Sequence, residues 1–379
     1  IDKLGSDLRG DPAAALLEVL DAEQNSTFRD HFVELPFDLS EVLFITTANT
    51  TSTIPKPLLD RMEVIELPSY TDEEKLQIAK SHLLPKQLKR HGLKKSQLKI
   101  TDDAIREIIV SYTRESGVRV LERELGSLCR KVAMGIVSET YKQAHVNGDN
   151  VETFLGPRKY YPEKQGMENQ VGLVNGLAWT SVGGTLLEAE ANVVPGSGKV
   201  ELTGNLGNVM KESARAAFTY IRSRAVQLGV EADFYKEKDI HVHFPEGAVP
   251  KDGPSAGIAV TTAMLSALTD RKIKAGIAMT GEVTLRGRVL PIGGLREKSM
   301  AALRNGIRTV IIPKDNETDL EEIDQTVRNA LQFIPVSHVD QVLAYALERP
   351  PLSQPAADQG GDVPLGDAGT STHTSLPRA

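Results

Sequence analysis

A serine introduces an uncharged helical segment in the second half of the chain. The sequence Lys-Asp-Gly-Pro-Ser-Ala-Gly-Ile (residues 251–258) runs without a break into the apolar helical stretch 259–268. A hydroxyl at this point lies beside the free N–H groups and the positive dipole end of the helix, where an oxyanion would be stabilised during acyl transfer. Ser255 is therefore either a nucleophile or an ordinary N-cap, and both interpretations fit this segment.

A histidine is the usual base for such a serine. The same segment satisfies G-x-S-x-G, the nucleophile elbow of α/β-hydrolases, which needs an acid and a histidine further along the chain. The fit is poor, because three prolines make the approach to Ser255 a loop where the elbow needs a strand. The later histidines are His338 and His373, and the second lies in a Pro- and Gly-rich tail. His241 and His243 alternate along an expected strand, and we expect them to be half-buried sheet residues.

A lysine can replace histidine as the base if burial lowers the pKa of its amine, so that the neutral form is available near pH 7. Residues 277–298 are typical of a strand, a turn, a second strand and a Gly-Gly entry into a helix, and Lys298 falls in the first turn of that helix. The helix dipole lowers the pKa of an amine at this position. Lys298 is thus the candidate base, and a solvated surface lysine is the competing interpretation.

Asp252, three residues before Ser255, has two candidate roles. It either shapes the loop that carries the serine or pairs with Lys298 when the site is idle. A carboxylate beside the amine would raise the pKa of Lys298 and so quench its basicity.

The composition is that of an ordinary globular protein of two or three domains, with 379 residues, 40% hydrophobic and 25% charged residues and a net charge of −7. The single cysteine, Cys129, excludes an internal disulfide and a Cys-rich zinc site, and we expect no metal. It favours a reducing, cytoplasmic compartment, and we place it in a helical core. No helical stretch reaches the roughly 20 apolar residues that span a membrane. Because the chain begins at Ile1, we expect it to be part of a longer protein.

Three folded units are expected ahead of a disordered tail. Residues 1–69 alternate helical and strand patterns, with a helix at 12–20 and a buried parallel strand at 42–46, which is typical of part of an α/β layer. Residues 70–157 predict a small helical domain that opens with the capping box Thr-Asp-Glu-Glu at 71–74. Its further expected helices are residues 101–111 and 118–138.

The third unit, residues 168–349, has short strands rich in Val, Ile and Thr that alternate with helical stretches at 209–228 and 255–268. This pattern predicts a mixed α+β domain. Residues 156–166 read as a linker, and residues 350–379 cannot bury enough apolar surface to fold. The overall fold class is therefore multidomain α/β and α+β.

The residues around Ser255 and Lys298 closely resemble the proteolytic domain of the bacterial Lon proteases, and the resemblance covers nearly the whole chain apart from its tail. It implies that Ser255 is the nucleophile and Lys298 the general base, with Thr280 helping to hold the lysine. The motifs are Pro-Lys-Asp-Gly-Pro-Ser-Ala-Gly at 250–257, Met-Thr-Gly-Glu-Val-Thr-Leu-Arg-Gly at 279–287 and Leu-Pro-Ile-Gly-Gly-Leu-Arg-Glu-Lys at 290–298.

The first half resembles the AAA+ ATPase module of the same family. Residues 1–69 match the C-terminal part of its large α/β subdomain, and residues 70–157 match its small helical subdomain. The resemblance implies nucleotide-sensing roles for three residues. Asn49 matches sensor 1, Arg61 the arginine finger and Arg119 sensor 2.

The family implies an ATP-dependent serine endopeptidase that degrades misfolded and regulatory proteins, as a cytoplasmic homohexamer in protein quality control and the stress response. Peptide hydrolysis would need no cofactor, and the motor would use Mg-ATP. The chain holds no Gly-x-x-x-x-Gly-Lys-[Ser/Thr] motif and none of the Walker B acids expected before Ile1. We therefore expect this chain by itself to cleave peptides without hydrolysing ATP.

Two alternatives concern what the protein does and what it binds. A non-proteolytic AAA+ remodeller or ring scaffold would match the first half, but would not need Ser255 and Lys298 together. The basic segment 86–99 carries six Lys or Arg and no acid, and some members of the resembled family bind DNA. A solvated helix and turn is favoured, because the segment lacks interleaved aromatic residues and the chain is acidic overall.

Overall fold

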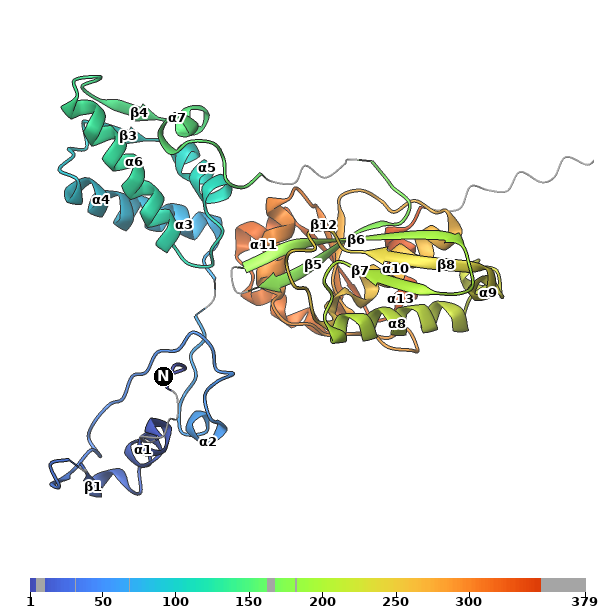
Figure 1. Cartoon of the computed structure of the whole chain (residues 1–379), viewed down its shortest axis with the longest axis horizontal. Coiled ribbons are helices and arrows are strands. Elements are labelled where there is room, and N and C mark those ends of the chain that lie inside the picture. The colour runs from blue at the N-terminus through green and yellow to red at the C-terminus, as the bar shows by residue number, and fades with distance from the viewer. Residues whose placement is uncertain (5–10, 31, 68, 162–167, 181–182, 349–379) are drawn as a thin grey trace, which may run out of the picture. The chain divides into compact units, whose positions relative to one another are not determined.

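The computed structural model of the chain describes residues 1–4, 11–30, 32–67, 69–161, 168–180 and 183–348 (Figure 1). They belong to two units, Ile1–Pro68 and Ser69–Ala379, and the second holds both the helical domain and the α+β domain. The expected tail and residues 162–166 of the expected linker lie outside the described residues.

The first unit contains the expected helix, α1 (Pro12–Val19), which starts at Asp11. The expected strand at 42–46 is wrong, since this segment forms no strand and Leu43 and Ile45 are 84% and 82% exposed. A parallel strand needs neighbouring strands for its backbone N–H and C=O groups, and the described part of this unit places none beside it. The other elements are β1 (Phe28–Arg29), β2 (Pro36–Phe37) and α2 (Lys56–Leu59).

The helical domain follows the sequence closely. The capping box is confirmed, because Thr71 Oγ1 accepts from the N–H of Glu74 at 3.1 Å and Glu74 Oε2 accepts from the N–H of Thr71 at 2.7 Å. Cys129 lies fully buried in the helical core, and burial raises the pKa of its thiol to about 11. The elements are α3 (Asp72–Ile78), a π-helical turn (Ala79–Leu83), α4 (Leu84–Arg90), β3 (Leu98–Ile100), α5 (Asp102–Tyr112), α6 (Arg119–Val137), β4 (Ala144–Val146) and α7 (Val151–Leu155).

The α+β domain is built on a seven-stranded sheet in the order β13-β12-β9-β5-β6-β8-β7. Strands β5, β9, β12 and β13 are parallel to one another, β6 is antiparallel to both β5 and β8, and β7 is parallel to β8. The strands are β5 (Leu173–Thr180), β6 (Gly183–Pro195), β7 (Val200–Thr203), β8 (Lys238–His243), β9 (Ile277–Met279), β12 (Thr309–Pro313) and β13 (Gln332–Val336). A separate hairpin joins β10 (Glu282–Val283) to β11 (Val289–Leu290).

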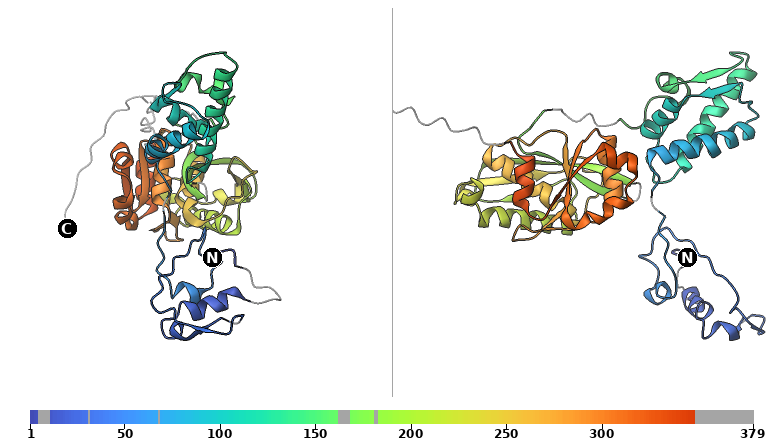
Figure 2. Two further views of the ribbon diagram at one scale, coloured as in Figure 1. Left: turned by 90° about the vertical axis from the view of Figure 1, so that its left-hand side faces the viewer. Right: turned by 180° about the vertical axis from the view of Figure 1, so that it is seen from behind.

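Helices cover both faces of this sheet (Figures 1 and 2). Successive strand residues point to opposite faces, and accordingly Met279 and Ala278 of β9 belong to two different hydrophobic clusters. The first cluster includes residues of α8 (Asn208–Ser223), α10 (Gly257–Thr269) and α13 (Val339–Ala346). The second includes residues of α11 (Leu295–Arg304) and α12 (Gln325–Ala330). α9 (Phe234–Glu237) precedes β8.

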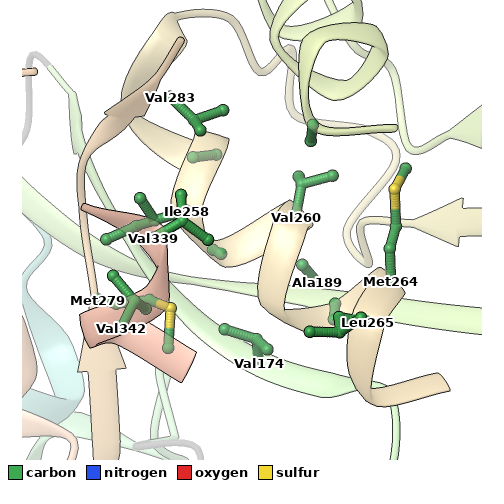
Figure 3. Packing of buried hydrophobic residues seen from close by; sticks show 14 of the residues in the cluster. Val174, Ala189, Ile258, Val260, Met264, Leu265, Met279, Val283, Val339 and Val342 are labelled. Carbon is green, nitrogen blue, oxygen red and sulfur yellow. The ribbon is translucent and has the colours of Figure 1, made fainter. Parts of the chain in front are cut away.

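Helix α10 lies at the centre of the first cluster. In Figure 3, Ile258 of this helix lies with Met279 of β9 and Val342 of α13, whereas Leu265 lies near Ala189 of β6. All residues from Gly257 to Ser266 are buried, which explains why this stretch carries no charge. The start of α10 is therefore held rigidly against the sheet.

Candidate active site

Ser255 lies in a 3₁₀ turn (Pro254–Ala256) that leads into α10. The loop before it passes through Gly253 at φ +123°, a backbone conformation that favours glycine. The carbonyl oxygen of Ser255 accepts the N–H of Gly281 at 2.8 Å, and the N–H of Ile258 donates to the carbonyl of Gly281 at 3.1 Å. This reciprocal pair of bonds fixes the serine to the residues that follow β9.

Lys298 comes from α11, on the opposite face of the sheet. It is the fourth residue of the helix, and its N–H donates to the carbonyl of Gly294 at 3.1 Å. The residue is 3% exposed, and burial lowers the pKa of its amine from 10.5 to about 8. The lysine is therefore buried and not solvated. The cause of the low pKa is desolvation by burial, the condition that a lysine base requires.

Thr280 connects the two candidate catalytic residues. Lys298 Nζ donates to Thr280 Oγ1 at 3.1 Å, and that hydroxyl donates to the carbonyl oxygen of Ser255 at 3.4 Å. Thr280 is itself held by its N–H, which donates to the carbonyl of Ile311 in β12 at 3.1 Å. In the described residues, Lys298 Nζ makes no hydrogen bond to Ser255 Oγ. The three residues meet at the carboxyl end of β9, the edge of a parallel sheet where sites typically form.

Asp252 shapes the loop. Its Oδ1 accepts the N–H of Met210 at 3.0 Å and the N–H of Gly253 at 2.9 Å. Met210 lies in the first turn of α8, and the N-cap residue of that helix, Gly207, offers no side chain of its own. Among the described residues, no ion pair joins Asp252 to Lys298. Of the two roles considered from sequence, the structure thus shows the loop-shaping one.

The histidines take no part in this arrangement. His241 and His243 share one face of β8 and are half-buried, and their rings bond to the same hydroxyl, Thr203 Oγ1, at 2.8 and 2.7 Å. His338 caps α13, where its Nδ1 accepts the N–H of Asp340. The expected structural role of the sheet histidines is confirmed.

The three residues expected to sense nucleotide belong to two different units. Asn49 and Arg61 lie in the first unit, and Arg119 lies in the second. Asn49 is exposed, and Arg61 forms an ion pair with Asp21 at 3.1 Å. Arg119 is the exposed first residue of α6. The lysines and arginines of the basic segment 86–99 are exposed too, as a solvated surface requires.

No cluster of three or more potential metal-ligating side chains occurs in the described part of the chain. Likewise, no helix within the described ranges is long and apolar enough to cross a membrane. The sequence analysis did not predict the backbone partners of the site, such as the carbonyl of Ile311. Every residue type has a backbone carbonyl, so the sequence cannot show which one makes the contact.

Comparison with known families and proteins agrees with this geometry. The model of the Lon protease (S16) C-terminal proteolytic domain matches residues 145–349, the Lon protease AAA+ ATPase lid domain matches 89–145, and the AAA family of ATPases associated with various cellular activities matches 1–70.

Individual relatives of the chain are Lon proteases too. Lon protease 1 of Bacillus subtilis is 58% identical over 347 residues, which are 92% of this chain and 45% of the relative. Lon protease of Escherichia coli is 56% identical over 352 residues, or 93% of this chain and 45% of the relative. The chain thus spans less than half the length of these relatives. Since one family model covers more than half of its residues, the chain belongs to the Lon protease family.

Proposed function

We propose that this chain carries the peptide-bond-cleaving site of an ATP-dependent serine endopeptidase, with Ser255 as nucleophile and Lys298 as general base. The observation that carries the proposal is the buried Lys298 amine, which bonds to the same Thr280 hydroxyl that contacts the backbone of Ser255. A buried amine with a pKa of about 8 is partly neutral at physiological pH, as a general base must be.

The hydrogen-bond capacity of a neutral amine fits this role. It has two N–H donors and one lone pair, so the bond to Thr280 leaves the lone pair free for the proton of Ser255. Ser255 Oγ would attack the scissile carbonyl as Lys298 takes its proton. The positive dipole end of α10 would stabilise the oxyanion, and the Lys298 ammonium would return the proton to the leaving amine. Water then hydrolyses the acyl-enzyme by the same route.

The alternative, a non-proteolytic remodeller or scaffold, is not favoured. Burying an ammonium group without a carboxylate partner costs free energy of folding. Lys298 is 3% exposed and bonds to a neutral hydroxyl, and a domain that only assembles would gain nothing from that cost. Thr280 acts as the positioning residue of the dyad, and Asp252 supports it by fixing the loop before Ser255.

For the longer protein, the matches to AAA and lid models support a motor that uses Mg-ATP. We assign Asn49 to sensor 1, Arg61 to the arginine finger and Arg119 to sensor 2 of that motor. Its substrates would be misfolded and regulatory proteins. It would work as a homohexamer in the cytoplasm, in protein quality control and the stress response. DNA binding through residues 86–99 forms no part of the proposal.

Replacing either member of the dyad should abolish peptide cleavage. Ser255→Ala and Lys298→Ala should each lower the kcat for an unstructured peptide by at least about 10³-fold, because nucleophile and base act as a unit. Lys298→Arg should be equally inactive, since a guanidinium does not release its proton. Hydrolysis of a fluorogenic peptide measures the effect, with the exposed Lys272→Ala as control. Near-normal activity in Ser255→Ala would refute the assignment.

The pH dependence follows from the Lys298 amine. Because its protonated form is inactive and its pKa lies near 8, kcat/KM should rise between about pH 7 and pH 9 and then level off. The measurement is a pH profile of peptide hydrolysis, repeated with His241→Gln and His243→Gln. A rise centred near 6.5, lost in either histidine variant, would instead indicate a Ser–His enzyme.

Burial of Lys298 should also cost stability. Below about pH 8 the amine is protonated in both states and the folded state bears the full penalty, so Lys298→Met should raise the free energy of unfolding by roughly 1 to 3 kcal/mol at pH 7. Between about pH 8 and 10.5 the unfolded chain binds the proton that the folded one lacks, so wild-type stability rises with pH and the gain shrinks. Urea unfolding of Lys298→Met and wild type at pH 7 and 9 measures the difference in their free energies of unfolding. A gain independent of pH would mean that packing, not charge, sets the difference.

A further inference from the structure

The helix that carries Lys298 starts without a side-chain cap. Its N-cap residue is Gly294, in the left-handed conformation at φ +70°, and no side chain of the described residues caps the first turn. Gly293 precedes it, so two successive glycines join α11 to the chain. Glycine has the greatest conformational freedom of any residue. Something else must therefore fix the point at which α11 begins.

The side chain of Asn316 holds that point. Its Oδ1 accepts the N–H of Ile292 at 3.0 Å, and its Nδ2 donates to the carbonyl of the same residue at 2.8 Å. Ile292 directly precedes the two glycines. Nδ2 also donates to Asp319 Oδ2 at 2.6 Å, and since a carboxylate only accepts, this bond determines which end of the amide is the donor. Asn316 is 3% exposed, so water does not compete for these bonds.

Asn316 lies in the turn that follows β12, and this strand also holds Thr280. The carbonyl of Ile311 accepts the N–H of Thr280, and Asn316 is five residues further along. Residues 311–316 thus hold both partners of the bond between Lys298 Nζ and Thr280 Oγ1. Ile311 holds Thr280 directly, and Asn316 holds the residue before the glycines that lead into the helix of Lys298.

We propose that Asn316 is a positioning residue for the peptidase reaction, which by clamping Ile292 sets the place of α11 and so keeps Lys298 on Thr280 and away from water. The proposal rests on the proposed function, because it assigns Asn316 to the base of that same site. Asp319 acts indirectly, because its carboxylate orients the side-chain amide of Asn316.

The test is Asn316→Ala, measured as kcat, KM and the pH profile of peptide hydrolysis. We expect kcat at neutral pH to fall roughly 10- to 100-fold, because a displacement of about 1 Å has that effect on catalysis. KM should change little. With α11 loosened, water reaches the amine, so the rise of the profile should move from near pH 8 towards 10.5. Asp319→Asn, at a half-buried position, should shift the profile in the same direction by less.

Asn305→Ala is the matched control. This amide lies at the other end of α11, where its Nδ2 donates to the carbonyl of Ala301 at 2.9 Å. Its loss should leave the pH profile unchanged. An unshifted profile in Asn316→Ala, or an equal shift in Asn305→Ala, would overturn the proposal. If Asn316→Ala does not fold, the profile of Asp319→Asn decides by the same criterion. Wild type and Ser255→Ala test the dyad separately, so failure of the proposed function would be recognised by itself.

Discussion

The site depends on an amine that is kept dry. Lys298 is almost fully buried, and its bond to Thr280 involves a neutral hydroxyl instead of a carboxylate. Desolvation then lowers the pKa of the amine without an opposing charge. To keep water out, α11 must stay packed on the sheet by its whole inner face, and the chain must enter the helix at a fixed point. The second hydrophobic cluster and the clamp at Ile292 meet these two requirements.

Two separate cores supply the two halves of the chemistry. The helix after Ser255 packs in the cluster on one face of the sheet, and the helix of Lys298 packs in the cluster on the other face. β9 contributes to both clusters, and its carboxyl end leads into Thr280. Thr280, the residue after this strand, therefore reaches both. Because interiors are close-packed, neither helix can shift without disturbing the sheet, and the site inherits the rigidity of two cores.

Local signals in the sequence were enough to name Ser255 and Lys298 as candidates, and the family resemblance then favoured them as a pair. The loop before Ser255, the glycines before Lys298 and the helical periodicity after each are all features of neighbouring residues. The partners of these residues were harder to predict. Asp252 bonds to Met210 and Asn316 to Ile292, at separations of 42 and 24 residues, and such pairs depend on sheet order. The wrong strand at 42–46 has the same cause, because apolar β-branched residues form a strand only when another strand lies beside them.

The placement of the acid is as important as that of the base. A carboxylate beside Lys298 would stabilise its ammonium form and raise the pKa of the amine. Asp252 is the acidic residue nearest to Ser255 in sequence, and its Oδ1 accepts two backbone N–H groups, one at the start of α8 and one in the serine loop. The same contacts that order the loop thus hold the carboxylate in a structural role. Thr280 can accept from the lysine in either protonation state, so it holds the amine in place and brings no negative charge beside it.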